Sequence, residues 1–125
     1  MKFFFVLMFL CFTINLSAQL DTVKTYFPNG NLESVVVYEK NVRQGEAVFY
    51  WENGNVKEKR NYVNDKIEGG VTTYYLNGKT KENYFIENGK RFGPYVFYDS
   101  LGAIVDGEFS FIGWGMIKEE LSFVG

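Results

Sequence analysis

Residues 50–56 of the chain read YWENGNV, and residues 74–80, 24 positions later, read YYLNGKT. The same pattern precedes them as YFPNGNL at 26–32 and follows them, without its Asn, as YDSLGAI at 98–104. Self-similarity at a fixed period is the signature of a repeat protein. The equivalent positions are Tyr26, Tyr50, Tyr74 and Tyr98, then Gly30, Gly54, Gly78 and Gly102, with a further glycine series at Gly45, Gly69 and Gly93.

Each unit contains two turn signals, and we interpret these glycines as structural turn residues. Pro28 fixes φ at about −65°, which fits position i+1 of a type I turn and excludes a type I′ turn there. Gly30 then takes the left-handed position that follows, in a hairpin loop with a G1 bulge. The second turn joins successive units and uses residues that mostly tolerate positive φ. It is expected at Lys40–Asn41, Asn64–Asp65 and Asn88–Gly89.

The segments between the turns are rich in β-branched and aromatic residues, which favour strands. Because every connection is short, neighbouring strands must be antiparallel. The sequence therefore predicts an all-β fold: a single elongated, twisted antiparallel meander sheet of about eight strands, built from 24-residue β-hairpin repeats. The strands are expected at about 22–27, 32–39, 45–51, 56–63, 70–76, 80–87, 93–99 and 103–112.

The first 18 residues are expected to be a signal peptide. Lys2 gives a minimal positive start, an apolar run extends from Phe3 to Leu16, and Ala18 supplies a small residue at the cleavage point. We therefore expect export to the periplasm, the cell envelope or the medium, with Gln19 as the mature N-terminus. The repeats would then fill residues 19–113 in about four units, and residues 114–125 would form a C-terminal cap or a truncated repeat.

Composition argues against several kinds of chemistry. The sequence has no His, and its one Cys, Cys11, lies in the segment predicted to be removed. The mature chain would therefore lack disulfides, the usual zinc ligands and the commonest general base. The net charge of −2 offers no basic surface to nucleic acid. We expect no catalytic residue, no metal, no cofactor and no nucleic-acid partner.

The units resemble the MORN repeat family, and more closely its bacterial variant form. That variant reads roughly Tyr-x-x-Asn-Gly-Lys, a polar strand, a second Asn-Gly or Asp-Gly turn, and then Gly-x-x-x-x-Tyr. Residues 74–98 fit this pattern, and so do residues 50–74. Bacterial proteins with such repeats are similar to those labelled as antitoxins of a YwqK type. The resemblance implies a sheet of hairpin repeats and, because MORN repeats are associated with membrane or protein contacts, a role in binding.

Two rows of side chains along the sheet are candidate sites. If the Asn-Gly turn sets the register, Tyr50 lies opposite Val56, and Val48 lies opposite Glu58. The tyrosine row then forms either the core of a thin protein or an aromatic binding strip. A carboxylate row beside it could hold a hard cation or act as an acid/base pair, although nearby lysines indicate a charge-mixed solvated face. The first row is Tyr26, Tyr50, Tyr74 and Tyr98 beside Leu32, Val56, Thr80 and Ile104; the second is Ser34, Glu58, Glu82 and Asp106.

Several functions are compatible with these features. The first is a non-catalytic secreted or envelope protein that acts as a platform for an unknown protein partner. The second is a module that binds a glycan or a lipid through the tyrosine row, and the third is an antitoxin or immunity-type protein. An enzyme would depend on Glu58 and Glu82. A meander also leaves edge strands unpaired, so we expect the N-terminal edge, about 22–27, to form a weak homodimer or to receive a partner's strand.

Overall fold

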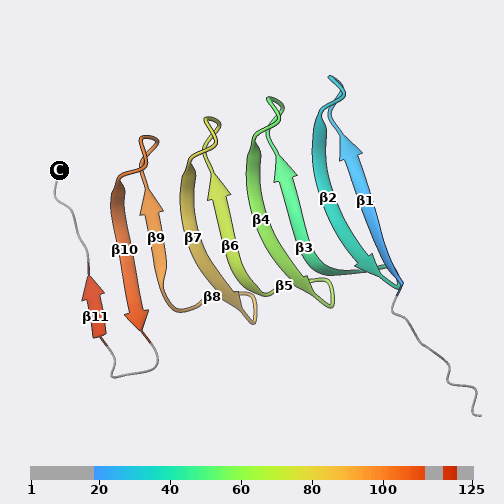
Figure 1. Ribbon diagram of the computed structural model, residues 1–125. Helices are drawn as coiled ribbons and strands as arrows, with labels where there is room; N and C mark the ends of the chain where they lie inside the picture. Colours follow the sequence, from blue (N-terminus) through green and yellow to red (C-terminus); the bar gives the residue numbers. More distant parts are fainter. Residues whose placement is uncertain (1–18, 112–116, 121–125) are drawn as a thin grey trace, which may run out of the picture.

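The computed structural model describes residues 19–111 and 117–120, and those residues form one antiparallel β-sheet (Figure 1). The predicted all-β meander is confirmed, and the described part of the chain contains no helix. The predicted signal peptide lies outside the described residues, as do Trp114, Met116, Leu121 and Phe123 of the predicted C-terminal cap.

Eight strands match the predicted segments closely: β1 (Leu20–Tyr26), β2 (Leu32–Glu39), β3 (Val42–Tyr50), β4 (Val56–Val63), β6 (Gly69–Tyr74), β7 (Thr80–Glu87), β9 (Tyr95–Tyr98) and β10 (Ile104–Phe111). The structure adds two-residue strands, β5 (Lys66–Ile67) and β8 (Lys90–Arg91), which lie just before β6 and β9 and pair with β4 and β7. It also adds β11 (Ile117–Glu120), which pairs with the end of β10.

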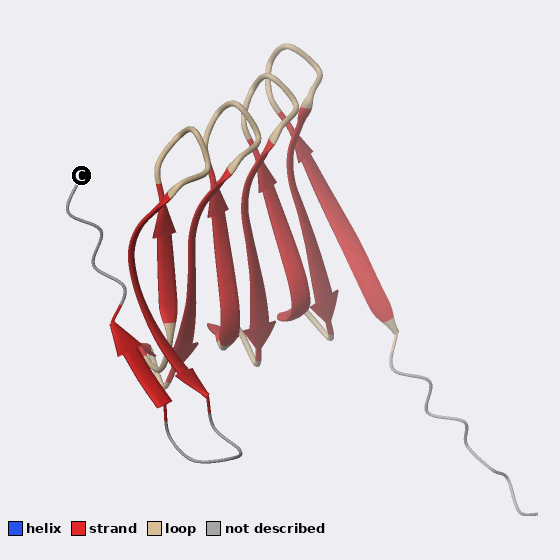
Figure 2. Cartoon of the chain, turned by 60° about the vertical axis from the view of Figure 1, so that its left-hand side comes forward, coloured by secondary structure: helices blue, strands red, loops and turns tan. Residues whose placement is uncertain are grey.

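The strands lie side by side in the order β1-β2-β3-β4-β6-β7-β9-β10-β11, so each hairpin adds to the edge of the previous one. Figure 2 shows the sheet as a single curved layer with no second layer packed against it. The hairpin turns β1–β2, β3–β4, β6–β7 and β9–β10 line one end of the strands, and the turns between units line the other. Both faces of the sheet are therefore accessible along most of their length.

The hairpin turns have the geometry that Pro28 predicts. The Gly30 amide donates to the Phe27 carbonyl at 2.9 Å, and the Phe27 amide donates to the Asn31 carbonyl at 2.8 Å, as in a type I turn followed by a G1 bulge. All seven turn glycines have positive φ, from +75° at Gly93 to +105° at Gly45. The turns between units also have positive φ at both central residues, for example 49° at Lys40 and 65° at Asn41.

A second irregularity follows each hairpin turn and corrects the predicted register. Tyr50 lies opposite Val56, as expected, but Phe49 lies opposite Glu58, so Lys57 is an extra residue in β4. Such a β-bulge changes which side chains share a face, because the period-2 alternation restarts after it. The predicted pairing of Val48 with Glu58 is therefore wrong, since Val48 pairs with Lys59. The same extra residue occurs in the hairpins β1–β2, β3–β4, β6–β7 and β9–β10, at Glu33, Lys57, Lys81 and Val105.

The core lies on a different part of the sheet from the tyrosine row. The buried cluster consists of Val36, Ala47 and Tyr62, with Tyr38, Phe49 and Ile67 packed against it. Tyr26 is 58% exposed, and Tyr50, Tyr74 and Tyr98 are only partly buried. None of these four tyrosines belongs to the buried cluster. The bulges give the reason, because they place Ala47, Phe49 and Tyr62 together on one face.

Candidate functional site: the arginine–aromatic face

Strand register places the core and the carboxylate row on the same face of the sheet. Residues directly opposite each other on neighbouring strands share a face. Ala47 lies opposite Val36 and Arg60, Phe49 lies opposite Ser34 and Glu58, and Thr73 lies opposite Glu58 and Glu82. We call this side the arginine–aromatic face and define it by Arg43, Phe49, Arg60, Tyr62, Tyr84 and Arg91, together with the neighbouring carboxylates Glu58 and Glu82.

Arginines stack on aromatic rings across the repeats. The Arg60 guanidinium lies 4.2 Å from the centre of the Phe49 ring and 5.6 Å from that of Tyr62. Arg43 covers Tyr62 at 4.3 Å, and one unit further Arg91 covers Tyr84 at 4.0 Å. A cation over a ring face is attracted by about 0.5–1 kcal/mol at an exposed site, and by more when it is desolvated. These contacts hold three long side chains in defined positions.

Each of these arginines also faces a carboxylate. Arg43 forms an ion pair with Asp65, Arg91 with Glu82, and Arg60 lies 3.7 Å from Glu58. The hydrogen bond from Arg43 lowers the pKa of Asp65, and the hydrogen bond to Glu82 raises the pKa of Arg91. Asp65 is solvent-exposed, so water and salt weaken its attraction to Arg43. Within the carboxylate row, Glu58 and Glu82 are therefore paired with arginines, whereas Asp106 accepts a hydrogen bond from the Tyr95 hydroxyl at 3.3 Å and Ser34 shares one with Thr25 at 2.6 Å. No group of three or more possible metal ligands occurs in the described part of the chain.

The face is hollowed between the second and third units. A depression of about 460 Å³ is lined by Arg43, Arg60, Tyr62 and Tyr84, among others. Two buried polar atoms on this face, Arg60 Nε and Thr73 Oγ1, make no hydrogen bond within the described structure. Both atoms are enclosed, so they are not offered to a bound molecule. The depression instead presents the outer edge of the Arg60 guanidinium between Tyr62 and Tyr84, and a planar guanidinium suits a carboxylate or carbonyl group.

The tyrosine row has the predicted cross-strand partners, but it lies outside the buried cluster. Tyr26, Tyr50, Tyr74 and Tyr98 pair with Leu32, Val56, Thr80 and Ile104 beside the hairpin turns. The bulge residues close to these pairs cover the next aromatic positions: Lys57 lies 4.8 Å from the Trp51 ring and Lys81 lies 5.7 Å from that of Tyr75. Tyr26 is the most open of the four, since Tyr50, Tyr74 and Tyr98 are partly buried.

The Asn-Gly turns also connect neighbouring units. Asn29 and Asn31 both donate from their side-chain amides to the Glu52 carbonyl, at 3.1 and 2.7 Å. Asn53 and Asn55 donate in the same way to the Leu76 carbonyl, both at 2.9 Å. Asn77 donates to the Ser100 carbonyl at 2.9 Å. We call this series the turn ladder. It ends where Leu101 occupies the position of these asparagines.

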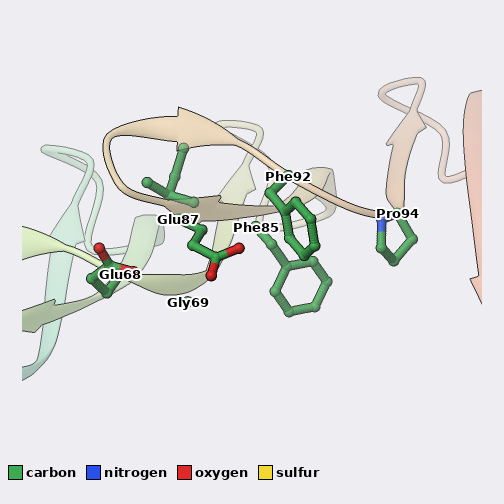
Figure 3. Close-up of a pocket in the computed structure, with 7 residues that line it drawn as sticks. Glu68, Gly69, Phe85, Glu87, Phe92 and Pro94 are labelled. Carbon is green, nitrogen blue, oxygen red and sulfur yellow. The ribbon is translucent and has the colours of Figure 1, made fainter. Parts of the chain in front are cut away.

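One apolar hollow lies near the turns at the other end of the strands (Figure 3). It measures about 490 Å³, and its lining includes Phe85, Phe92 and Pro94, with Glu68 and Glu87 at its side. Phe85 is 45% exposed and Phe92 is 59% exposed. Since Phe85 follows Tyr84 in β7, it belongs to the face opposite the arginine–aromatic face. The hollow gives that second face a small apolar contact area.

Comparison with known families supports the repeat assignment. Residues 22–40 and 43–64 match the family model described as the MORN repeat variant. The two matched segments correspond to the hairpins β1–β2 and β3–β4 of this sheet. The hairpin β6–β7 lies beyond the matched residues, yet it has the same turn, bulge and ladder contacts as these MORN-like hairpins.

No curated protein matches the chain significantly. The described residues also contain no helix that is long and apolar enough to cross a bilayer. The MORN repeat variant match therefore concerns the architecture of the first hairpins, and the identity of a partner does not follow from it.

Sequence reasoning missed the stacked arginines. The sequence predicted only a charge-mixed solvated face around the carboxylate row, because local sequence does not show the register at the bulges. The 24-residue period does not reveal the stacks either, because Arg43 stacks on Tyr62 later in the sequence, whereas Arg91, two periods after Arg43, stacks on Tyr84 earlier in the sequence.

Proposed function

We propose that this protein is a non-catalytic interaction protein whose arginine–aromatic face binds a protein partner. The observation that carries the proposal is the stacking of Arg43, Arg60 and Arg91 on aromatic rings of successive repeats. Arginine and tyrosine are enriched among the residues that dominate binding energy at protein interfaces. Side chains that are ordered before binding lose less conformational entropy when a partner arrives.

The charge pattern supports a protein partner over nucleic acid. Every arginine of the face is paired with a carboxylate, and the net charge of the chain is −2. Nucleic acids select surfaces where positive charge accumulates. A face of alternating charges and rings instead suits the mixed chemistry of a protein surface.

The proposal is tested by proximity labelling in the source cell with three forms of the protein. The double variant Arg60→Ala and Arg91→Ala removes two stacks, whereas Lys59→Ala changes a neighbouring charge on the opposite face. We expect the proteins labelled by the wild type to be retained with Lys59→Ala and reduced by about tenfold or more with the double variant, a loss typical of interface arginines. Equal labelling by all three forms would exclude this face as the interface, provided that the variants keep the wild-type circular dichroism spectrum.

We further propose that the chain is exported and cleaved after Ala18. The support is the sequence pattern of a charged residue, an apolar run and a small residue before Gln19. Intact-mass analysis of envelope and medium fractions should show a chain that begins at Gln19. A full-length product in the cytoplasm would contradict export and would favour the antitoxin-type role.

A glycan- or lipid-binding role through the tyrosine row remains the alternative. It is supported by Tyr26, whose ring is largely exposed beside Leu32. A glycan array and a vesicle-flotation assay separate this role from protein binding. Binding that is lost with Tyr26→Ala and kept with Arg60→Ala would establish the alternative.

A further inference from the structure

The edge strand β1 has an apolar pattern that is the same read in either direction. It reads LDTVKTY, and all seven residues are exposed. Its large hydrophobic residues stand at both ends and in the middle: Leu20 is 58% exposed, Val23 is 46% exposed and Tyr26 is 58% exposed. β1 pairs with β2 on one side, and among the described residues no strand lies on its other side (Figure 1). One flank of its backbone therefore offers unpaired N–H and C=O groups to another strand.

We propose that a second copy of this chain pairs with β1 in the antiparallel register that places Val23 opposite Val23. In this register Leu20 meets Tyr26 of the second copy, and Thr22 meets its Lys24. Every large exposed side chain of β1 then gains an apolar partner, and no charged residue lies opposite a like charge. Cross-strand pairs of this kind stabilise antiparallel strands.

The neighbouring registers fail by the same criteria. A two-fold pairing centred on Lys24 sets two lysines against each other, and one centred on Asp21 sets two aspartates against each other. A pairing centred on Thr22 leaves Tyr26 without a residue of β1 opposite it. The register centred on Val23 is therefore the one that side-chain chemistry selects.

The proposed pairing also continues the rows of the sheet. Val23 lies opposite Val36, which lies opposite Ala47 in the core cluster. A two-fold axis perpendicular to the sheet keeps the same face of both copies on the same side. The valine row thus continues through both copies, and the two arginine–aromatic faces form one surface. Because the pair uses up the edge strand of each copy, it is closed and does not grow into a fibre through β1.

Sedimentation of the purified chain, as the cell processes it, over a range of concentrations tests the proposal. The wild type should form dimers as concentration rises. Val23→Lys places two lysines opposite each other and should weaken the dimer by about tenfold or more, since each 1.4 kcal/mol changes the dissociation constant tenfold. Thr22→Glu places a carboxylate opposite Lys24 of the second copy and should strengthen it severalfold.

The two variants are expected to change the dissociation constant of the dimer in opposite directions. Thr22→Glu therefore reports on the register even if Val23→Lys impairs folding. A wild type that stays monomeric at every concentration would overturn the dimer. If Thr22→Glu leaves the dissociation constant unchanged or raises it, the register is wrong.

Discussion

In the three hairpin turns that contain Asn-Gly, the Asn and the Gly have separate roles. Gly54 supplies the backbone conformation, with φ of +92°, and a Cβ at this position would meet no atom within 4 Å. Asn53 supplies hydrogen bonds, because its amide donates to the Leu76 carbonyl and its carbonyl oxygen accepts from the Asn55 amide. The glycine thus serves its own turn, and the asparagine also serves the next unit.

Replacing Gly54 by valine should destabilise the protein through backbone strain alone. A β-branched residue at positive φ costs roughly 1–3 kcal/mol, and a Cβ at Gly54 adds no clash of its own, because it would meet no atom within 4 Å. Thermal unfolding followed by circular dichroism measures the effect, with Glu52→Gln as a control on the same turn. A melting temperature within a degree or two of the wild type would contradict the turn assignment.

Asn53→Asp isolates one bond of the turn ladder. The carboxylate still accepts from the Asn55 amide but can no longer donate to the Leu76 carbonyl, so we expect a loss of about 0.5–1.5 kcal/mol. Denaturant titration measures it beside Asn53→Ala, which loses both interactions. If only the alanine variant is destabilised, the bond between units contributes nothing.

At the scale of the strands, the turns were predictable and the bulges were not. Glycine, Asn and Pro impose local backbone geometry, so their spacing located the hairpins before any contact was known. The extra residues at Lys57 and Lys81 depend on pairing with the neighbouring strand, and local sequence does not record that pairing. The face that carries the stacked arginines was missed for this reason.

Two adjacent glycines in the third unit should respond to alanine in opposite ways. Gly69 has φ of +89°, so Gly69→Ala should cost roughly 1–2 kcal/mol. Gly70 has ordinary strand geometry, and its Cβ would lie 3.6 Å from the Phe85 ring, a normal contact. Gly70→Ala should therefore gain about 0.5–1 kcal/mol, because glycine weakens a strand interior. Chemical denaturation measures both, and changes of the same sign would contradict the assigned strand geometry.

At the scale of the whole molecule, the buried hydrophobic side chains lie in the strands from β2 to β6. They are Val36, Ala47, Tyr62 and Val71, whereas every residue of the edge strand β1 is exposed. Repeat proteins of this kind are stabilised mainly by contacts between neighbouring units. The sheet is therefore expected to differ in local stability along its length.

Hydrogen exchange measured by mass spectrometry should reveal this gradient. Amides of β3 should exchange most slowly, because this strand contains Ala47 and lies between the long strands β2 and β4. Amides of β9 should exchange faster. Tyr62→Ala should remove most of the difference, because its side chain completes the cluster. Uniform exchange across the sheet of the wild type would show that the cluster does not control local opening.

The turn ladder gives the molecule a direction in which it can lengthen. Each donor amide points to a carbonyl of the following unit, from Asn29 to Glu52, from Asn53 to Leu76 and from Asn77 to Ser100. A tandem duplication of residues 53–76 inside the array would restore a donor and an acceptor at each new junction. A unit added after Leu101 would meet a side chain that has no amide to donate. Gene duplication, or a designer who extends the sheet, is thus expected to succeed between existing hairpins sooner than beyond the last one.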